Sequence, residues 1–240
     1  MTFFPLPHIE NSAKRIRVFH AGVYLVDSQN AKLVWLHERY PTYWFLESEL
    51  PKEYLKPTQS GNKDTTIYDL TLGEQPQGVI THHHIGKLAG LFTIKFDKVD
   101  MWFEEDEEIF VHPKDPYKRV DIIQSKRHVR VEVNGVEVAN TTSPKLLFET
   151  SLPTRTYIPK VDCHLELLKP SSLKTSCPYK GDASYYHVQT PSGLVENVVW
   201  WYPTTVLECV PIKGLVAFYD EKVDVWIDGV KQERPKTHFS

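Results

Sequence analysis

The sequence predicts an all-β protein built from two tandem copies of one domain, with very little helix. The first observation is an internal repeat, because residues 90–102 and 214–226 align without a gap and share Gly, Leu, Lys, Val, Asp and Trp. The second is alternation of polar and apolar residues on both sides of short turns. The third is composition: 6 Trp, 12 Tyr, 11 Phe and 17 Pro against 2 Met favour short strands joined by stiff turns.

The repeat continues upstream and sets the domain organisation. Residues 17–22 and 130–135 share Arg, Val and Gly at the same spacing. The 240-residue length accommodates two small domains, each large enough to bury a core. We expect an N-terminal copy over residues 1–120 and a C-terminal copy over residues 121–240. An acidic, proline-containing stretch within 103–128 forms the expected connection.

Two hairpins are the clearest local elements. Alternating residues flank Asn134-Gly135, and Asn-Gly is the strongest hairpin signal because both residues tolerate positive φ. The first copy repeats the pattern around Ala21-Gly22, where Ala21 weakens the turn signal. A short helical turn is expected over residues 203–208. Further strands are expected at residues 145–149, 155–159, 163–168, 184–189, 195–201, 215–219 and 223–227.

Composition and charge exclude several classes of partner. The net charge of −3 gives no basic face for nucleic acid. No apolar run approaches the roughly 18 residues that span a bilayer. The first fifteen residues lack the basic start and apolar core of a secretory signal, and the three cysteines are not spaced as metal pairs. We therefore expect a cytoplasmic protein, monomeric or homodimeric, with neither a membrane nor a nucleic-acid partner.

The most distinctive segment occurs in one copy alone. Residues 175–186 read TSCPYKGDASYY, whereas the matching SGNKDTTIY of the first copy has no Cys, Pro or Lys-Gly. We expect a loop in which Lys180 orients an anionic group or acts as an amine and Cys177 is a nucleophile. The proton donor is expected to be Tyr179, Tyr202 or Tyr219. The alternative is a tight turn with a buried Cys and a solvated Lys.

Aromatic residues near this segment suggest a pocket wall. In the strand containing WWYP, neighbouring indoles point to opposite faces, so Trp200 can line an apolar pocket with Tyr202 as its hydrogen-bonding tip. Arg155, Tyr186 and Tyr219 are the other candidate ligand-binding residues. The alternative for the tryptophans is packing in the core. The Val-Asp-x-Trp segment present in both copies is interpreted as scaffold.

The three consecutive histidines at 82–84 raise the possibility of a metal site. In a strand His82 and His84 share one face, and two imidazoles can chelate zinc or copper. A structural zinc site needs four ligands, however, and the sequence has no Cys-x-x-Cys or His-Glu-x-x-His. We therefore expect no metal ligands and no cofactor.

Together, the CPYKGDASYY, WWYP, GLVAFY and VDVW segments resemble the family called domain of unknown function 427, also labelled nucleotidyltransferase-like. The resemblance covers nearly the whole chain and extends to the linker. It implies a β-tent-like fold, in which two antiparallel sheets meet at an angle, as in methionine sulfoxide reductase B. Relatives of that fold often hold zinc with Cys-x-x-Cys pairs, which are missing here. The first copy departs from the family loop, so a site is expected in the second copy.

Three functions remain open at this point. The first is a small-molecule enzyme without a redox cofactor, of lyase, isomerase or cyclase type, using the aromatic pocket with Lys180. The second is a binding module that recognises a small ligand without turnover. The third is a nucleotidyl- or phosphoryl-transfer enzyme, as the family label suggests, although the sequence has no phosphate loop with a metal-binding carboxylate pair.

Overall fold

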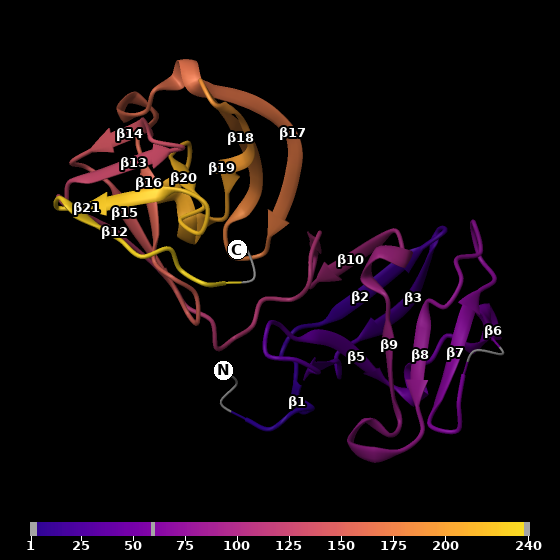
Figure 1. Ribbon diagram of the computed structural model, residues 1–240. Coiled ribbons are helices and arrows are strands. Elements are labelled where there is room, and N and C mark those ends of the chain that lie inside the picture. Colours follow the sequence, from indigo (N-terminus) through magenta and orange to yellow (C-terminus); the bar gives the residue numbers. More distant parts are fainter. Residues whose placement is uncertain (1–3, 59–60, 238–240) are drawn as a thin grey trace. The chain divides into compact units, whose positions relative to one another are not determined.

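The protein consists of two compact units, each built from two antiparallel sheets (Figure 1). The structure is a computed structural model that describes residues 4–58 and 61–237. The chain divides after Asp115, a few residues before the boundary expected from the sequence. Apart from strands and loops, the described residues form short 3-10 helices, which confirms the all-β prediction. No helix in this part of the chain is long and apolar enough to cross a membrane.

The first copy has a seven-stranded sheet in the order β1-β4-β5-β9-β8-β7-β6 and a four-stranded sheet in the order β11-β10-β2-β3. Its strands are β1 (His8–Asn11), β2 (Ile16–His20), β3 (Val23–Ser28), β4 (Lys32–Trp35), β5 (Thr42–Leu46), β6 (Leu55–Pro57), β7 (Thr65–Leu70), β8 (Ile80–His83), β9 (Leu91–Ile94), β10 (Met101–Glu104) and β11 (Glu107–Ile109). Its 3-10 helices are η1 (Glu47–Glu49), η2 (Lys52–Tyr54), η3 (Gly86–Leu88) and η4 (Phe96–Lys98).

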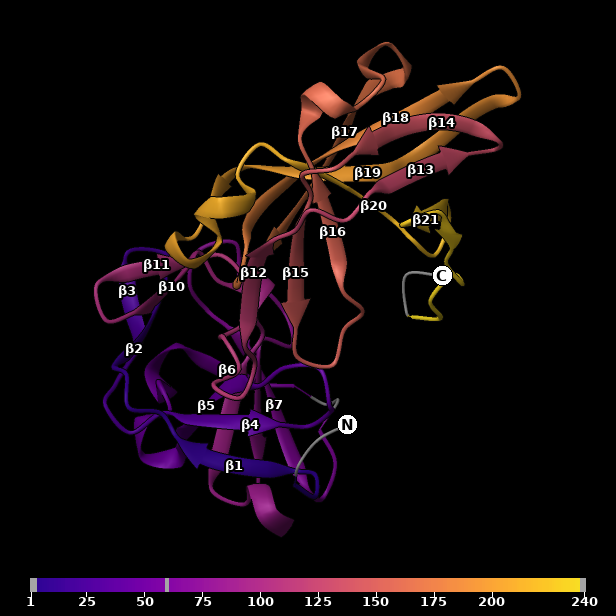
Figure 2. The same ribbon diagram turned by 90° about the vertical axis from the view of Figure 1, so that its left-hand side faces the viewer.

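The second copy has the same two sheets, in the orders β12-β15-β16-β20-β19-β18-β17 and β14-β13-β21-β22. Its strands are β12 (Val120–Gln124), β13 (Val129–Val133), β14 (Val136–Thr141), β15 (Lys145–Glu149), β16 (Arg155–Ile158), β17 (Leu168–Cys177), β18 (Gly181–Thr190), β19 (Gly193–Thr205), β20 (Val216–Phe218), β21 (Asp224–Ile227) and β22 (Val230–Lys231). Its 3-10 helices are η5 (Lys160–Asp162), η6 (Leu165–Leu167) and η7 (Leu207–Ile212). Figure 2 shows β12, β15 and β16 side by side, and β13 beside β14.

The two strand orders are identical once β1 to β11 are matched with β12 to β22. Strand pairing therefore aligns the copies position by position. Leu33 pairs with Tyr43 in the first copy, and Leu146 pairs with Thr156 at the same place in the second. Residues at equivalent positions of the two copies differ in side-chain size and charge at several places.

The repeated Val-Asp-x-Trp segment illustrates such a difference. Trp102 pairs with Val18 in the first copy, but the equivalent Val131 pairs with Val225, one residue before Trp226. A one-residue slip moves a side chain to the opposite face of a sheet. Trp102 consequently lies in the core, whereas Trp226 is partly exposed and stacks against the guanidinium of Arg130.

The tightest hairpins follow the expected pattern. Ala21 and Asn134 both adopt positive φ, at 49° and 50°. Alanine is strained in this conformation. In the first copy the carboxylate of Asp100 supports the turn by accepting hydrogen bonds from the Ala21 backbone N–H, at 2.8 Å, and from the His20 ring, at 3.1 Å.

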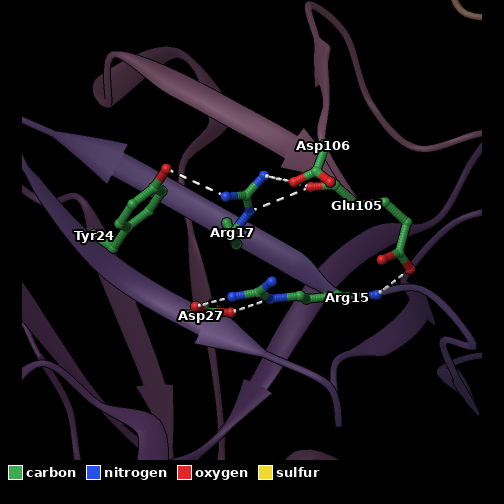
Figure 3. A network of polar contacts seen from close by, with 6 residues as sticks. All are labelled: Arg15, Arg17, Tyr24, Asp27, Glu105 and Asp106. Carbon is green, nitrogen blue, oxygen red and sulfur yellow. Dashed lines mark hydrogen bonds and ion pairs between the residues drawn. The ribbon is translucent and has the colours of Figure 1, made fainter.

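Polar side chains cover the outer face of the smaller sheet in the first copy (Figure 3). Arg15 forms a two-point ion pair with Asp27, with distances of 2.5 and 2.6 Å. Arg17 lies between Tyr24 and Asp106 and donates hydrogen bonds to both. The side chains of Arg15 and Asp27 are 40% and 42% exposed, whereas that of Arg17 is only 14% exposed. The exposed pair of Arg15 with Asp27 contributes little to stability.

Two expected elements differ from the structure. Residues 163–168 form η6 and the start of β17 instead of a strand, and the helical turn expected at 203–208 lies at η7 instead. β17 is the edge strand of its sheet, a position where a proline such as Pro170 is tolerated because one side of the strand has no partner. Exposed Lys, Ser and Thr side chains give β17 no alternating pattern to recognise.

Candidate functional site

The CPYKG segment is a tight turn between two strands and not an extended loop. Thr175 to Cys177 belong to β17, where Cys177 pairs with Gly181 at the start of β18. The three residues between them reverse the chain, and the N–H of Lys180 donates to the carbonyl of Cys177 at 3.2 Å. The expectation of a loop is therefore wrong for residues 175–177.

The side chains of this turn are engaged by neighbouring groups. Lys180 forms an ion pair with Glu149, and their side chains are only 12% and 6% exposed. Tyr179 is buried, and its carbonyl accepts a hydrogen bond from the Cys209 thiol at 3.2 Å. Cys177 is half-buried. The alternative of a solvated Lys180 is wrong, and the catalytic roles of Lys180, Cys177 and Tyr179 stay predictions.

Four of the five ligand-binding candidates lie around one aromatic cluster. Trp200 and Tyr202 are buried in a core cluster on the face of the larger sheet that carries Tyr157. The indole N–H of Trp200 donates to the hydroxyl of Tyr157 at 3.2 Å. Tyr219 packs on Trp200 with ring centroids 4.6 Å apart, and the Arg155 guanidinium lies 5.5 Å from the Trp200 centroid. Core packing, the alternative weighed for the tryptophans, describes Trp200.

Tyr186 lies apart from this cluster. Its ring stacks on Trp201 at a centroid distance of 6.0 Å, and its hydroxyl accepts a hydrogen bond from Lys160. The Lys160 ammonium also lies 3.3 Å from the Trp201 centroid. These contacts fasten η5 to the sheet by a cation–π interaction.

A buried ion-pair cluster borders the aromatic residues. Arg155 donates two hydrogen bonds to Glu221, at 2.6 and 2.8 Å, and lies 3.7 Å from Asp220. Burial opposes ionisation of Glu221, but hydrogen bonds from Arg155 and Thr237 win and lower its pKa to about 2. Asp220 has no such bidentate partner. Burial therefore raises the pKa of Asp220 to about 7, despite the attraction of Arg155.

Asp220 also lines a cavity between the two sheets of the second copy. The cavity has a volume of about 350 Å³, near the lower end of the range of about 300–1,000 Å³ for ligand pockets. Its walls come from β13, β15, β16 and β21, and the segment after β22 closes one side. The lining residues include Val129, Leu146, Thr156, Val225, Ile227 and Gln232.

The first copy explains why this space is open. There the rings of Tyr43 and Phe96 both stack on Trp102, and all three belong to or pack on the core cluster between the sheets. The equivalent residues of the second copy are Thr156, Asp220 and Val225. Smaller or polar side chains thus replace three aromatic rings, and a cavity forms where the first copy is filled.

The copies also differ at the residue that stands at the open end of the cavity in the second copy. In the first copy Glu104 accepts a hydrogen bond from the Tyr43 hydroxyl at 2.8 Å and forms an ion pair with Lys14. At the Glu104 position the second copy has Ile227, which pairs with Val129. The carboxylate that neutralises Lys14 in the first copy is therefore replaced by an alkyl group in the second copy.

None of the eight site residues expected from the sequence lines this cavity. The sequence does contain a signal for it, because the ungapped repeat places Phe96 opposite Asp220. A change from an aromatic to an acidic residue at a core position requires either a partner or a cavity. A strongly shifted carboxyl pKa in a cavity is also a feature of functional sites.

The histidine cluster of the first copy shows no ligand arrangement. His82 is buried, its ring lies 4.5 Å from that of His84, and its Nε2 lies 3.7 Å from Glu47. Burial lowers the pKa of His82, although Glu47 opposes the shift. Among residues 4–58 and 61–237, no three His, Cys, Asp or Glu side chains are grouped to hold a metal ion.

Replacing Asp220 by Asn is expected to stabilise the protein in a pH-dependent manner. The pKa of Asp220 rises from 3.8 to about 7 on folding, so ionisation costs stability as pH increases through that window. At pH 4 the folded group is protonated and the unfolded group is about half ionised, so the substitution should change the free energy of unfolding by less than about 1 kcal/mol. At pH 8 we expect Asp220→Asn to raise the free energy of unfolding by about 2–4 kcal/mol.

Urea denaturation at pH 4 and pH 8 measures this difference. Asp121→Asn, which removes a carboxylate from an exposed ion pair with Arg119, is the control and should change stability by less than about 1 kcal/mol at either pH. An Asp220→Asn protein that gains nothing at pH 8 would show that Asp220 is well solvated.

The fold and the cavity define a tandem two-sheet β protein in which the first copy has a packed core and the second has a cavity between its sheets. A family model described as Domain of unknown function (DUF427) matches residues 8–105 and again residues 121–229. These matches cover most of the chain, which therefore belongs to this family, as the sequence resemblance predicts. No curated protein matches the chain.

Proposed function

We propose that the second copy is a small-molecule-binding domain and that its ligand occupies the cavity between its two sheets. The observation that carries this proposal is the contrast between the copies. The same fold packs Tyr43 and Trp102 into the space that Thr156 and Val225 leave open. The first copy shows that this fold accommodates a filled core, so an open cavity in the second copy is consistent with a function that needs the space.

The chemistry of the cavity supports a ligand of mixed character. Val129, Val223 and Val225 form a buried apolar floor, while Asp220 and Thr156 supply a few polar groups. Pockets for small molecules combine apolar walls with a small number of orienting polar groups. An enzyme of lyase, isomerase or cyclase type would use the same cavity, with Asp220 near neutrality as its acid or base.

Binding without turnover is the simpler reading, because Lys180 is already paired with Glu149, away from the cavity lining. Nucleotidyl transfer would require clustered phosphate-binding and metal-binding groups. Such a carboxylate cluster is not found among the residues that the structure describes. A cytoplasmic location forms part of the proposal, since all three cysteines are free thiols, as is usual in a reducing compartment.

Filling the cavity is expected to abolish ligand binding. Thr156→Tyr introduces the residue that the first copy carries as Tyr43, so the larger sheet of the fold accepts it. A thermal-shift screen of a metabolite library on the full chain would identify ligands of the wild type. Their affinity should fall at least about tenfold in Thr156→Tyr, because the ring occupies the volume that the ligand needs.

Thr142→Tyr provides the matched control, since Thr142 is exposed in the turn after β14. This variant should bind every ligand with wild-type affinity. If the ligands bind Thr156→Tyr as tightly as the wild type, the cavity is not their site and the proposal fails.

A further inference from the structure

The cavity is electrostatically polarised along β21, and this polarity defines the class of its ligand. Asp220 precedes β21, whereas His128 pairs with Asp228 just beyond the other end of the strand. Arg127 adjoins His128, so it lines the cavity at the far end from Asp220. The two ends are separated by the length of β21, roughly 10 Å at 3.4 Å per residue.

The end near Asp220 carries excess negative charge. Arg155 neutralises Glu221 with two hydrogen bonds and is shared with Asp220, so one guanidinium faces two carboxyl groups. Glu233 adds a carboxylate at this end, because the segment after β22 runs back along β21. Its direction is fixed by three contacts: Gln232 N–H to Val225 O at 2.8 Å, Arg234 to Asp224 at 3.0 Å and Thr237 to Glu221 at 2.6 Å.

Other cations near this end are already engaged. Asp224 accepts the ammonium of Lys231 at 3.1 Å and the guanidinium of Arg234 at 3.0 Å. A ligand cation would therefore meet Asp220 and Glu233. Among the residues that the structure describes, the one existing contact that it would compete with is the 3.7 Å approach of Arg155 to Asp220. An ammonium group is the natural complement to this end.

The opposite end carries the positive charge of Arg127, and the carboxylate of Asp228 at this end accepts a hydrogen bond from the backbone N–H of His128 at 3.0 Å. The counterpart of Arg127 in the first copy, Lys14, is neutralised by Glu104, but Ile227 stands at the Glu104 position here. In the part of the chain that the structure describes, the guanidinium of Arg127 makes no side-chain hydrogen bond or ion pair. Arginine recognises carboxylates with a two-point geometry.

We propose that the ligand is a small molecule with an amine at one end and a carboxylate at the other, joined by a short apolar chain. This inference rests on the proposed binding function. The amine lies at Asp220 and Glu233, and the carboxylate lies at Arg127. The apolar chain runs over Val225 and Leu146, which line the cavity.

Calorimetric titration at pH 8, where Asp220 is ionised, tests this class with three probes of one chain length. 6-Aminohexanoate carries both charges, hexylamine only the amine and hexanoate only the carboxylate. We expect 6-aminohexanoate to bind the full chain at least about tenfold more tightly than either single-charge probe. Each end contributes a charge-assisted contact, and the two contacts act together on one molecule.

Variants at each end assign the orientation. Arg127→Gln should reduce the affinity for 6-aminohexanoate to about that for hexylamine. Asp220→Asn should reduce it toward that for hexanoate, with Glu233 retaining part of the contact to the amine. Arg119→Gln, which changes an exposed arginine outside the cavity, is the control and should leave the affinity for 6-aminohexanoate unchanged.

The outcomes separate the ligand class from the cavity itself. Equal affinity for all three probes, or no binding of 6-aminohexanoate, overturns the ligand class. The cavity function then still stands or falls on whether Thr156→Tyr removes the ligands found in the library screen. Loss of 6-aminohexanoate binding in both end variants, with the control unchanged, supports both proposals.

Discussion

Arg155→Ala is expected to destabilise the second copy by about 3–5 kcal/mol, the cost of removing one partner from a buried ion pair. The side chain of Glu221 is 0% exposed, and two of its hydrogen bonds come from Arg155. Without the guanidinium, Glu221 and Asp220 would face each other with no cation between them. The remaining hydrogen bond from Thr237 cannot compensate for two buried carboxyl groups.

Urea denaturation followed by hydrogen-exchange mass spectrometry measures this loss, because peptides report the two copies separately. Arg119→Ala is the matched control: its ion pair with Asp121 is exposed, so its removal should cost less than about 1 kcal/mol. Unchanged exchange of β16 and β20 in Arg155→Ala would show that the cluster contributes nothing to stability.

Gly181→Ala is expected to destabilise the second copy by about 2–6 kcal/mol. Gly181 has a φ of +107°, which costs an L-residue about 1–3 kcal/mol. A Cβ at this position would also lie 2.6 Å from the carbonyl oxygen of Thr204, a backbone atom of the paired strand β19. Relieving that overlap requires β18 and β19 to separate, which adds about 1–3 kcal/mol.

Gly193→Ala isolates the two contributions to this cost. Gly193 has a φ of +128° in the next turn, but nothing lies within 4 Å of a Cβ there. Its substitution should therefore cost only the conformational strain of about 1–3 kcal/mol. Equal losses of unfolding free energy in the two variants, measured by the same urea titration, would mean that the overlap with Thr204 is relieved at no cost in stability.

Much of the fold is predictable from the sequence because its determinants are local or repeated. The ungapped match of residues 90–102 with 214–226 predicts the duplication, and the turns at Ala21 and Asn134 form as the alternating pattern indicates. The exposed edge strand β17 escapes prediction because burial on neither face imposes a period of two on its sequence.

The site is less predictable because it depends on residues that are missing from the core. Asp220 and Val225 lie in the repeated segment 214–226, whose Val-Asp-x-Trp part is interpreted as scaffold, and Thr156 lies far from both in the chain. The strand pairing shows that Thr156 and Val225 occupy the positions of Tyr43 and Trp102, and the ungapped repeat places Asp220 at the position of Phe96. The distinctive CPYKG segment reflects instead a tight turn with a close backbone contact.

Its lysine illustrates the same limitation. An isolated sequence presents Lys180 as a reactive or ligand-binding amine, whereas the structure pairs it with Glu149, which lies 31 residues away. Buried ion pairs of this kind require both partners to be placed by tertiary structure. Local motifs therefore indicate where the chain is special without indicating whether the reason is packing or chemistry.

A methyl NMR titration of the full chain, with the ligand that binds most tightly in the library screen, tests whether the cavity of the second copy is the binding site. We expect the largest chemical-shift changes at the cavity methyl groups of Leu146, Val225 and Ile227, and we expect all three to saturate at the same ligand concentration. Shifts confined to the first copy, or to residues that surround Lys180 and Trp200, would contradict this expectation. In that case the cavity would be a packing difference between the copies and not a binding site.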